Sequence, residues 1–224
     1  MARYERPDYW TLRAKKEGYP ARSVYKLKEA DEKFGLLKPG GGVFRVLDLG
    51  AAPGSWSLYV LRTLASRFQN GRAFLAAADL APLSREYGNR EYDGREHGGR
   101  IHGRDLFEGD HFFFMQGDIT SRAVRDALVS RGPYNLVISD AAPATTGNRS
   151  VDTFRSLELA GTAADYAASS LCPGGSLFVK VFQGGDAPAL LKKIREQFTA
   201  GKSFKPASCR SESFETYYLG LGKK

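Results

Sequence analysis

Short apolar runs alternate with amphipathic stretches from residue 44 to the end of the chain. Unbroken apolar runs flanked by turn residues are typical of buried strands, and apolar positions three or four residues apart are typical of helices. The apolar runs fall at 44–50, 73–80, 112–118 and 176–182. A further run begins the segment 134–143, which ends in a loop. The amphipathic stretches fall at 55–68, 121–131, 152–171 and 187–198. This alternation predicts an α/β fold, in which helices cover both faces of a parallel sheet.

Three segments depart from this alternation. Two strand candidates at the end of the chain, 203–208 and 214–220, have little sequence between them and predict an antiparallel pair at one edge of the sheet. Residues 8–35 predict a helical N-terminal extension that is rich in Lys and Arg. Residues 84–111 lack apolar periodicity and contain "EYGNR", "EYDGR", "EHGGR" and "IHGR" in succession. Such a composition buries too little apolar surface to order a chain, so we interpret 84–111 as a flexible insertion.

The three histidines, His97, His102 and His111, fall in or beside this insertion, which leaves a metal site as an alternative. A solvated loop is the more common role of such a segment, and we predict no metal site. Its mixture of arginine, glycine and tyrosine is also a composition that can lie along RNA through charge and stacking.

Composition narrows the class of protein. The chain has 224 residues, 42% of them hydrophobic, enough for one sizeable domain or two small ones. No stretch approaches the roughly 20 apolar residues that span a bilayer, and no hydrophobic signal region is present, so we expect a cytoplasmic protein. Cys172 and Cys209 lack metal-ligand spacing and are interpreted as ordinary thiols. The net charge of +8 favours a polyanionic partner, with nucleic acid ahead of membrane.

One lysine stands where an apolar residue is expected. Lys180 lies inside "GGSLFVKVFQGG", residues 174–185, whose apolar character predicts burial on both faces of the sheet. An ammonium group is costly to bury without a partner. Lys180 is therefore either a functional group or a side chain that reaches solvent from an edge strand.

A glycine loop and four acids follow the predicted strands. "LDLGAAPGSW", residues 47–56, leads from the first strand into a helix, but its spacing is not the dinucleotide pattern G-x-G-x-x-G, and Pro53 removes one amide. The loop therefore fits a cofactor without phosphates. Each of four strand ends carries an aspartate, and we expect them to meet at the carboxyl edge of the sheet, where open α/β folds bind ligands: Asp48, Asp79, Asp118 and Asp140. Asp79 is placed to accept ribose hydroxyls and Asp118 an adenine amino group. Turn formation and helix capping would explain any one of them alone.

Together these motifs resemble the FtsJ-type ribosomal RNA 2′-O-methyltransferases (the RlmE family). The resemblance rests on "DLGAAPGSW", "GD", "SDAAP" and "LFVKVFQG", on "AKKEGYPARSVYKL" near the N-terminus and on "ESFETYYLGLGKK" at the end. It runs from about Asp8 to the last residue, apart from 84–111. It implies a class I, Rossmann-like methyltransferase fold with a seven-stranded sheet over residues 36–224, preceded by an RNA-binding extension at 1–35.

The resemblance also implies a cofactor, a substrate and a set of site residues. The methyl donor would be S-adenosyl-L-methionine, and the acceptor a uridine ribose of 23S ribosomal RNA, in free RNA or in the 50S subunit, bound by a monomer. The family's catalytic tetrad falls on Lys26, Asp140, Lys180 and Glu215. Its donor-binding positions fall on Gly50, Gly54, Trp56, Asp79, Asp118 and Asp140. Lys180 would be the central base or hydroxyl-orienting group, and Asp140 would orient it.

Two positions complicate this assignment. Ser55 stands where the family has a second glycine in the loop, which would tighten the approach to the donor. Glu212 lies close to Glu215, but only Glu215 is followed by the "TYY" strand pattern, so we assign the tetrad to Glu215.

Other functions remain open on the sequence alone. A tRNA 2′-O-methyltransferase of the same superfamily is the nearest alternative, and a non-catalytic RNA-binding module is another, although no tetrad residue is lost. A nicotinamide dehydrogenase is disfavoured by the glycine spacing. The N-terminal extension interleaves cations with aromatics, which suits contact with phosphates and exposed bases, or simple packing on the sheet. These residues are Arg3, Tyr4, Arg6, Tyr9, Trp10, Arg13, Lys15, Lys16, Tyr19, Arg22, Tyr25 and Lys28.

Overall fold

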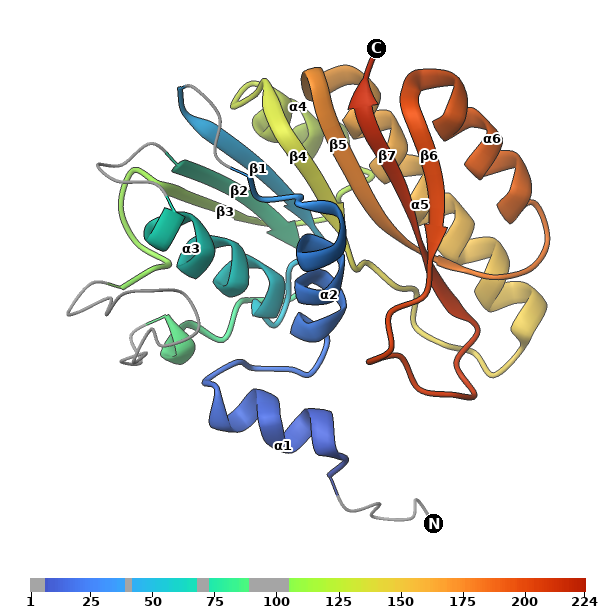
Figure 1. Ribbon diagram of the computed structural model, residues 1–224, viewed down its shortest axis with the longest axis horizontal. Coiled ribbons are helices and arrows are strands. Elements are labelled where there is room, and N and C mark those ends of the chain that lie inside the picture. Colours follow the sequence, from blue (N-terminus) through green and yellow to red (C-terminus); the bar gives the residue numbers. More distant parts are fainter. Residues whose placement is uncertain (1–6, 39–41, 68–72, 89–104) are drawn as a thin grey trace.

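The predicted α/β fold is confirmed by a single seven-stranded sheet. The computed structural model describes residues 7–38, 42–67, 73–88 and 105–224 (Figure 1). The strand order is β3-β2-β1-β4-β5-β7-β6. The strands are β1 Phe44–Leu49, β2 Ala73–Asp79, β3 Phe112–Gln116, β4 Tyr134–Ser139, β5 Leu171–Phe182, β6 Phe198–Phe204 and β7 Glu215–Lys223. β1 to β5 pair in parallel, so their carboxyl ends meet at one edge, as the positions of the four aspartates require.

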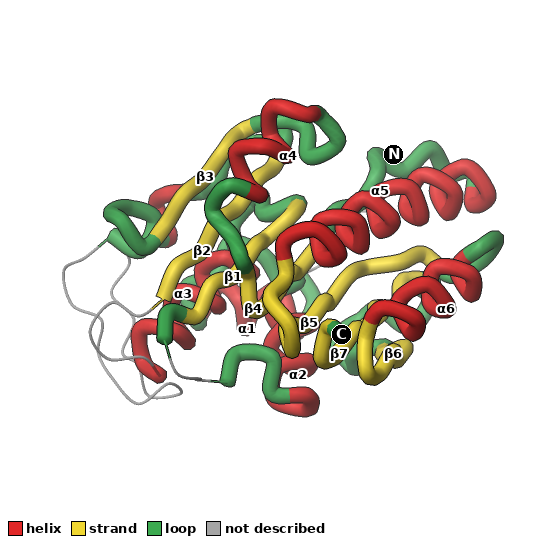
Figure 2. The backbone as a smooth tube through the Cα atoms, turned by 90° about the horizontal axis from the view of Figure 1, so that it is seen from above, coloured by secondary structure: helices red, strands yellow, loops and turns green. Residues whose placement is uncertain are grey.

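Helices cover both faces of this sheet (Figure 2). α1 Tyr9–Lys16, α2 Val24–Phe34 and α3 Ser55–Arg67 pack on one face, and α4 Arg122–Val129, α5 Arg149–Ser170 and α6 Ala187–Gln197 on the other. Successive residues of a strand serve opposite faces: in β1, Val46 packs with the first group and Leu47 with the second. Both sides of the sheet are therefore hydrophobic core, which explains the unbroken apolar runs in the sequence.

The antiparallel part of the sheet differs in detail from the prediction. The predicted antiparallel pair at one edge is present: β6 is the edge strand, and β7 lies between β5 and β6 and runs antiparallel to both. β6 begins at Phe198, directly after α6, instead of at residue 203, and pairs with β7 from Phe198 opposite Lys223 to Phe204 opposite Tyr217. The predicted segment 203–208 overlaps β6 only at its first two residues. The strand ends at Phe204, before Pro206, which has no N–H to donate to a strand ladder.

The N-terminal segment is helical, as predicted, and forms two helices that are not separate from the sheet. Asp8 caps α1 by accepting the Thr11 amide, and Gly35 ends α2 in the left-handed conformation at φ 65°. Val24, Leu27 and Ala30 are completely buried in the core shared with α3. Residues 24–37 thus belong structurally to the domain that follows them.

A buried arginine ties the loop after α1 to α3. The Arg62 guanidinium donates to the carbonyls of Glu17 and Gly18 and stacks on Tyr19, with 4.6 Å between its Cζ and the ring centroid. These contacts hold the N-terminal segment against the helix that follows the glycine loop.

The ends of the predicted insertion also pack on the domain. A 3₁₀ turn spans Arg85–Tyr87, and Leu83, Leu106 and Phe107 are buried in the core on the α3 side. Residues 84–88 and 105–111 are therefore anchored, contrary to an insertion that is flexible from end to end. The central residues 89–104, with His97 and His102, lie outside the described residues. Within the described ranges, no helix is long and apolar enough to cross a membrane.

Candidate active site

The glycine loop between β1 and α3 has a conformation that requires its glycines. Gly50 has φ 76°, and a Cβ there would lie 2.6 Å from the Cα of Ala141. Gly54 has φ 110°. The Gly50 and Ala51 amides donate to the Ala78 carbonyl, which closes the loop against the end of β2. The loop is thus a tight turn in which two positions with positive φ are occupied by glycine.

Backbone donors of α3 lie directly after this loop. The first intrahelical bond runs from the Leu58 amide to the Gly54 carbonyl, so the amides of Ser55, Trp56 and Ser57 have no partner within the helix. Free amides at a helix N-terminus suit an anionic group such as a carboxylate. The side chains point elsewhere: the Trp56 indole is buried and donates to the Ser23 carbonyl, and the Ser55 hydroxyl accepts the Ala21 amide. Ser55 therefore connects the loop to the N-terminal segment, and Trp56 offers a ligand only its backbone.

The predicted acids at the strand ends have different environments. Asp79 accepts the amides of Ala52 and Ala81, at 2.9 and 2.8 Å, and so braces the glycine loop. Asp118 is exposed and accepts the Thr120 amide and hydroxyl through one oxygen, and these bonds lower the pKa of Asp118. Both carboxylates lie at the rim, where each can accept further hydrogen bonds from a ligand.

Asp48 lies below this rim and is fully buried. Its Oδ2 accepts the Ser57 hydroxyl at 2.7 Å, and its Oδ1 has no hydrogen-bond partner. Burial raises the pKa of Asp48 to about 7, against the Ser57 hydrogen bond, and the charges of Asp140 and Asp79 raise it further. The ionised form of Asp48 is therefore unfavourable in this buried position unless a cation lies nearby.

The lysine within β5 is buried and paired. Lys180 is 8% exposed, and its Nζ donates to Asp140 twice, to Oδ1 at 3.0 Å and to the carbonyl at 2.8 Å. Lys180 lies on a central strand between β4 and β7, so it does not reach solvent from a sheet edge. The pairing explains how the ammonium is tolerated in an apolar strand.

A second ion pair lies beside the first. Lys26, on α2, contacts Glu215, at the start of β7, with 2.7 Å between Nζ and Oε1, and both side chains are 12% exposed. Glu212 instead lies on the surface and accepts the hydroxyl of Ser211. The structure thus brings together Lys26, Asp140, Lys180 and Glu215 from α2, the end of β4, β5 and β7.

These pairs affect each other's protonation. Burial acts to raise the pKa of Asp140, but Lys180, Lys26 and a tyrosine hydroxyl together lower it below its usual value. Burial acts to lower the pKa of Lys26, but the charges of Asp140 and Glu215 outweigh it and raise that pKa. Lys26 is therefore a permanent cation and Asp140 a permanent carboxylate at neutral pH.

The comparison of this chain with known proteins decides the family. The model of the FtsJ-like methyltransferase family matches residues 19–223. The chain belongs to this family. The FtsJ-like match covers both the glycine loop and the lysine–carboxylate pairs, as the sequence motifs predicted.

Relatives and solved structures agree with this assignment. A "ribosomal RNA large subunit methyltransferase E" of Treponema denticola is 46% identical over 222 residues, which cover 99% of this chain and 98% of the relative. A protein of the same name from Oleidesulfovibrio alaskensis is 45% identical, with 97% and 92% covered. A ribosomal RNA methyltransferase of Plasmodium falciparum superposes with a TM-score of 0.66 over 92% of this chain and 98% of its own, at 23% identity, and so shares the FtsJ-like fold.

One residue of this FtsJ-like site was not predicted. Tyr217 lies opposite Lys180 in the β5–β7 pairing, and its hydroxyl donates to Asp140 Oδ1 at 2.7 Å. Its ring stacks on Phe178, with centroids 4.8 Å apart, and lies 5.8 Å from Lys26 Nζ. The sequence could have indicated Tyr217, because it lies two residues after Glu215, and residues two apart in a strand have side chains on the same face.

A surface cavity of about 300 Å³ opens onto the Lys26–Glu215 pair. Its lining comes from the segment before α2, from α2 itself and from the loop between β6 and β7, and consists of Ala21, Arg22, Ser23, Lys26, Arg210, Ser213 and Glu215. An acceptor can thus approach Lys26 from the side of the N-terminal segment. Among the described residues, no group of His, Cys, Asp and Glu side chains could hold a metal ion.

Proposed function

We propose that this chain transfers a methyl group from S-adenosylmethionine to a ribose 2′-hydroxyl of large-subunit ribosomal RNA. The observation that carries the proposal is the pair of lysine–carboxylate contacts, Lys180–Asp140 and Lys26–Glu215, beside the carboxyl ends of β1 to β4. Family membership supports methyl transfer, and the names of relatives at 46% and 45% identity support the RNA class.

The crevice at the strand ends fits this donor chemically. We propose that Asp79 holds the ribose hydroxyls, that Asp118 accepts from the adenine amino group, and that Asp140 faces the cationic end. The turn made by Gly50 and Gly54 lets the donor approach the backbone, and the first amides of α3, including that of Trp56, would hold its carboxylate. When bound, the donor supplies a methyl group already activated for attack by its sulfonium charge.

We propose that Lys180 accepts the proton of the attacking 2′-hydroxyl. Two of its bonding positions are used by Asp140, which leaves one position on Nζ for the hydroxyl. Lys180 takes the proton in its neutral form, whose lone pair occupies that position. Asp140 and Tyr217 orient the amine, and Glu215 holds Lys26 in place. A proton transfer to a positioned group contributes about 10²–10⁴-fold to the rate.

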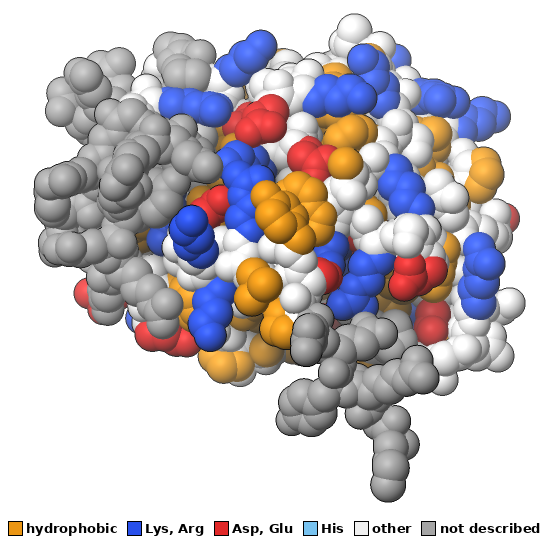
Figure 3. Space-filling model, turned by 60° about the horizontal axis from the view of Figure 1, so that its bottom comes forward, with side chains coloured by type: hydrophobic (Ala, Val, Ile, Leu, Met, Phe, Trp, Pro, Cys, Tyr) orange, Lys and Arg blue, Asp and Glu red, His pale blue; other side chains and the backbone are white. Residues whose placement is uncertain are grey.

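The form of the RNA and the assembly of the protein are part of the proposal. Lysine and arginine side chains spread across the face turned forward in Figure 3, with acidic side chains between them, which suits contact with a phosphate backbone. We propose a monomer that acts in the cytoplasm. Its substrate would be a uridine of 23S RNA, either in the free RNA or in the 50S subunit.

The test is a map of 2′-O-methylation in total RNA from cells with and without this gene. One nucleotide of the large-subunit RNA should lose its methyl group in the deletion strain and regain it when the wild-type gene is returned. Loss of a methyl group from a tRNA instead would favour the tRNA alternative. An unchanged map would contradict the proposed function.

A further inference from the structure

We propose that the cavity between α1 and the β6–β7 loop binds a nucleotide that flanks the target in single-stranded RNA. Tyr9 would stack on its base, and Arg22 and Arg210 would contact the phosphate between it and the target. This inference rests on the proposed function, because it extends the path of the same RNA strand.

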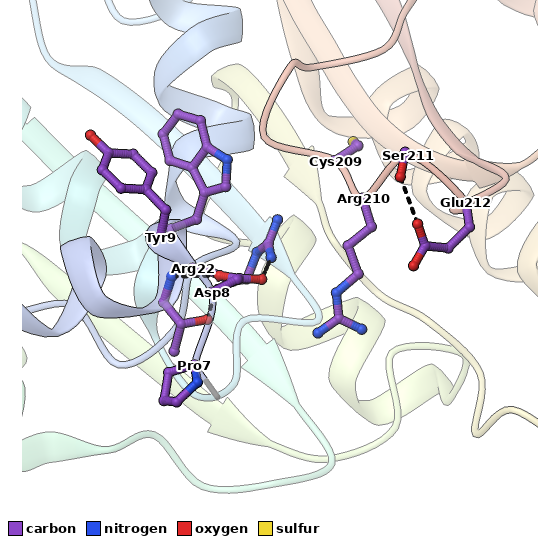
Figure 4. Close-up of a pocket in the computed structure, with 10 residues that line it drawn as sticks. Pro7, Asp8, Tyr9, Arg22, Cys209, Arg210, Ser211 and Glu212 are labelled. Carbon is purple, nitrogen blue, oxygen red and sulfur yellow. Dashed lines mark hydrogen bonds and ion pairs between the residues drawn. The ribbon is translucent and has the colours of Figure 1, made fainter. Parts of the chain in front are cut away.

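The cavity has a volume of about 420 Å³. It lies between the start of α1 and the loop that follows β6, and its lining is Pro7, Asp8, Tyr9, Trp10, Thr11, Arg22, Cys209, Arg210, Ser211 and Glu212. Figure 4 shows Tyr9 on one side, Arg210 extending from the other side, and Asp8 with Arg22 between them. The cavity lining thus includes an aromatic residue on one side, a guanidinium group on the other side and a second guanidinium group between them.

This cavity adjoins the cavity over Lys26 and shares two lining residues with it. Arg22 and Arg210 line both, and the second cavity also contains Lys26 and Glu215. A strand whose reacting ribose lies at Lys180 and Lys26 therefore passes the two arginines before it reaches Tyr9. The phosphate that follows or precedes the target ribose is the anion that this position would receive.

The charges at this passage favour an anion. Arg22 pairs with Asp8 and donates to the Ser208 carbonyl. Burial, followed by the neighbouring positive charge of Arg210, lowers the pKa of Arg22. Arg210 is exposed and makes no ion pair within the described part of the chain. A phosphate between the guanidiniums would relieve their repulsion and give Arg210 a partner. The two carboxylates in the lining are already engaged: Asp8 by Arg22 and Thr11, and Glu212 by Ser211.

Two neighbouring aromatic residues of α1 line the cavity: Trp10 anchors the helix, and Tyr9 is exposed to solvent. Trp10 packs on the buried Tyr25, with ring centroids 4.9 Å apart, and so fixes α1 against α2. Tyr9 meets Trp10 edge-on at 5.3 Å but remains 67% exposed. An exposed ring beside cationic side chains is the arrangement by which proteins stack the bases of single-stranded RNA. Base-paired RNA would not present a free base to Tyr9, so the occupant is a single strand.

The test measures methyl transfer to large subunits isolated from cells that lack the gene. Tyr9→Ala should raise the KM for the RNA substrate about 5- to 150-fold, the range for loss of one stacked base, while kcat changes little. Tyr9→Phe keeps the ring and should behave like the wild type. Leu12→Ala is the matched control, because Leu12 is 57% exposed on the same helix but does not line the cavity.

A second measurement tests the RNA affinity contributed by Tyr9 and Arg210 and does not depend on catalysis. Fluorescence anisotropy with a labelled oligouridine should show weaker binding for Tyr9→Ala and for Arg210→Gln. For Arg210→Gln, the slope of log affinity against log salt should flatten by about 0.7, the effect of one lost phosphate contact. Arg122→Gln on α4, whose side chain is 94% exposed, should leave that slope unchanged.

The outcomes separate this inference from the proposed function. A wild-type protein that transfers no methyl group to the subunits contradicts the proposed function. Wild-type transfer together with unchanged KM and oligouridine affinity in Tyr9→Ala and Arg210→Gln overturns the flanking-nucleotide site alone. A loss of kcat without a change in KM would also overturn it, because it would show an effect on the reaction centre.

Discussion

The two halves of the candidate site are built in different ways. The donor half, at the ends of β1, β2 and β3, is built from turns at neighbouring strand ends, whose hydrogen bonds span 2 positions for Asp118 and Thr120 and 27 positions for Asp79 and Ala52. The acceptor half joins side chains from α2, the end of β4, β5 and β7, and the Tyr217–Asp140 bond spans 77 positions. The donor half joins adjacent strand–loop segments, whereas the acceptor half joins side chains from elements that lie far apart along the chain. Substitutions should therefore affect the two halves independently.

The largest expected effect is on the acceptor half. Lys180→Ala should reduce kcat about 10²–10⁴-fold, because it removes the group that accepts the hydroxyl proton. The affinity for S-adenosylmethionine, measured by calorimetry, should stay within a few-fold of the wild type. Lys193→Ala is the control, since Lys193 forms an exposed ion pair with Asp165 on the far face.

Loss of donor binding in Lys180→Ala would mean that the halves are coupled. Because the variant leaves Asp140 buried without its main partner, its thermal unfolding should be measured as well. Lys180→Met, which keeps the length of the side chain, separates the loss of the amine from the loss of packing.

A smaller effect is expected for Asp48, which lies beneath both halves. Its pKa is raised to about 7, so the folded state binds a proton more tightly than the unfolded state, and stability falls as pH rises from about 4 to about 7. Asp48→Asn keeps an oxygen for the Ser57 hydroxyl and removes the charge. Its free energy of unfolding relative to the wild type should rise by about 3 kcal/mol between pH 5 and pH 8, since each of the roughly two pH units between pH 5 and the pKa of about 7 contributes about 1.4 kcal/mol.

Urea unfolding at the two pH values measures this difference for the donor-free protein. Asp126→Asn, on the exposed surface of α4, should show no such trend. A constant difference for Asp48→Asn would show that the buried carboxyl group is ionised at both pH values or at neither.

The smallest effect is expected at the rim of the donor half. Asp118→Asn preserves an oxygen for Thr120 and removes only the charge that would face the adenine, so donor affinity should fall about 10-fold, near the low end for hydrogen bonds to charged groups. The kcat at saturating donor should not change. Calorimetry with S-adenosylmethionine tests this, and Asp126→Asn again serves as the control.

The element order, the glycine loop and the aspartates at the strand ends were readable from the sequence, because each depends on residues close along the chain. Apolar runs marked the strands, Gly50 and Gly54 marked the tight turn, and an acid after a strand marked the carboxyl edge. The start of β6 was misplaced by five residues, from 203 to 198, because strand pairing with β7 overrides local propensity.

The burial of Lys180 was also predictable, but its partners were assigned only through the family resemblance. Without that resemblance, Lys26 is an ordinary helix lysine. The "TYY" pattern already indicated Glu215 rather than Glu212. Tertiary structure alone decided that Glu215 pairs with Lys26, that Tyr217 shares Asp140, and that the side chains of Ser55 and Trp56 point to the N-terminal segment. The physical reason is distance along the chain: pattern and turn chemistry act over a few residues, whereas these contacts depend on the β5–β7 register and on how α2 packs against the sheet.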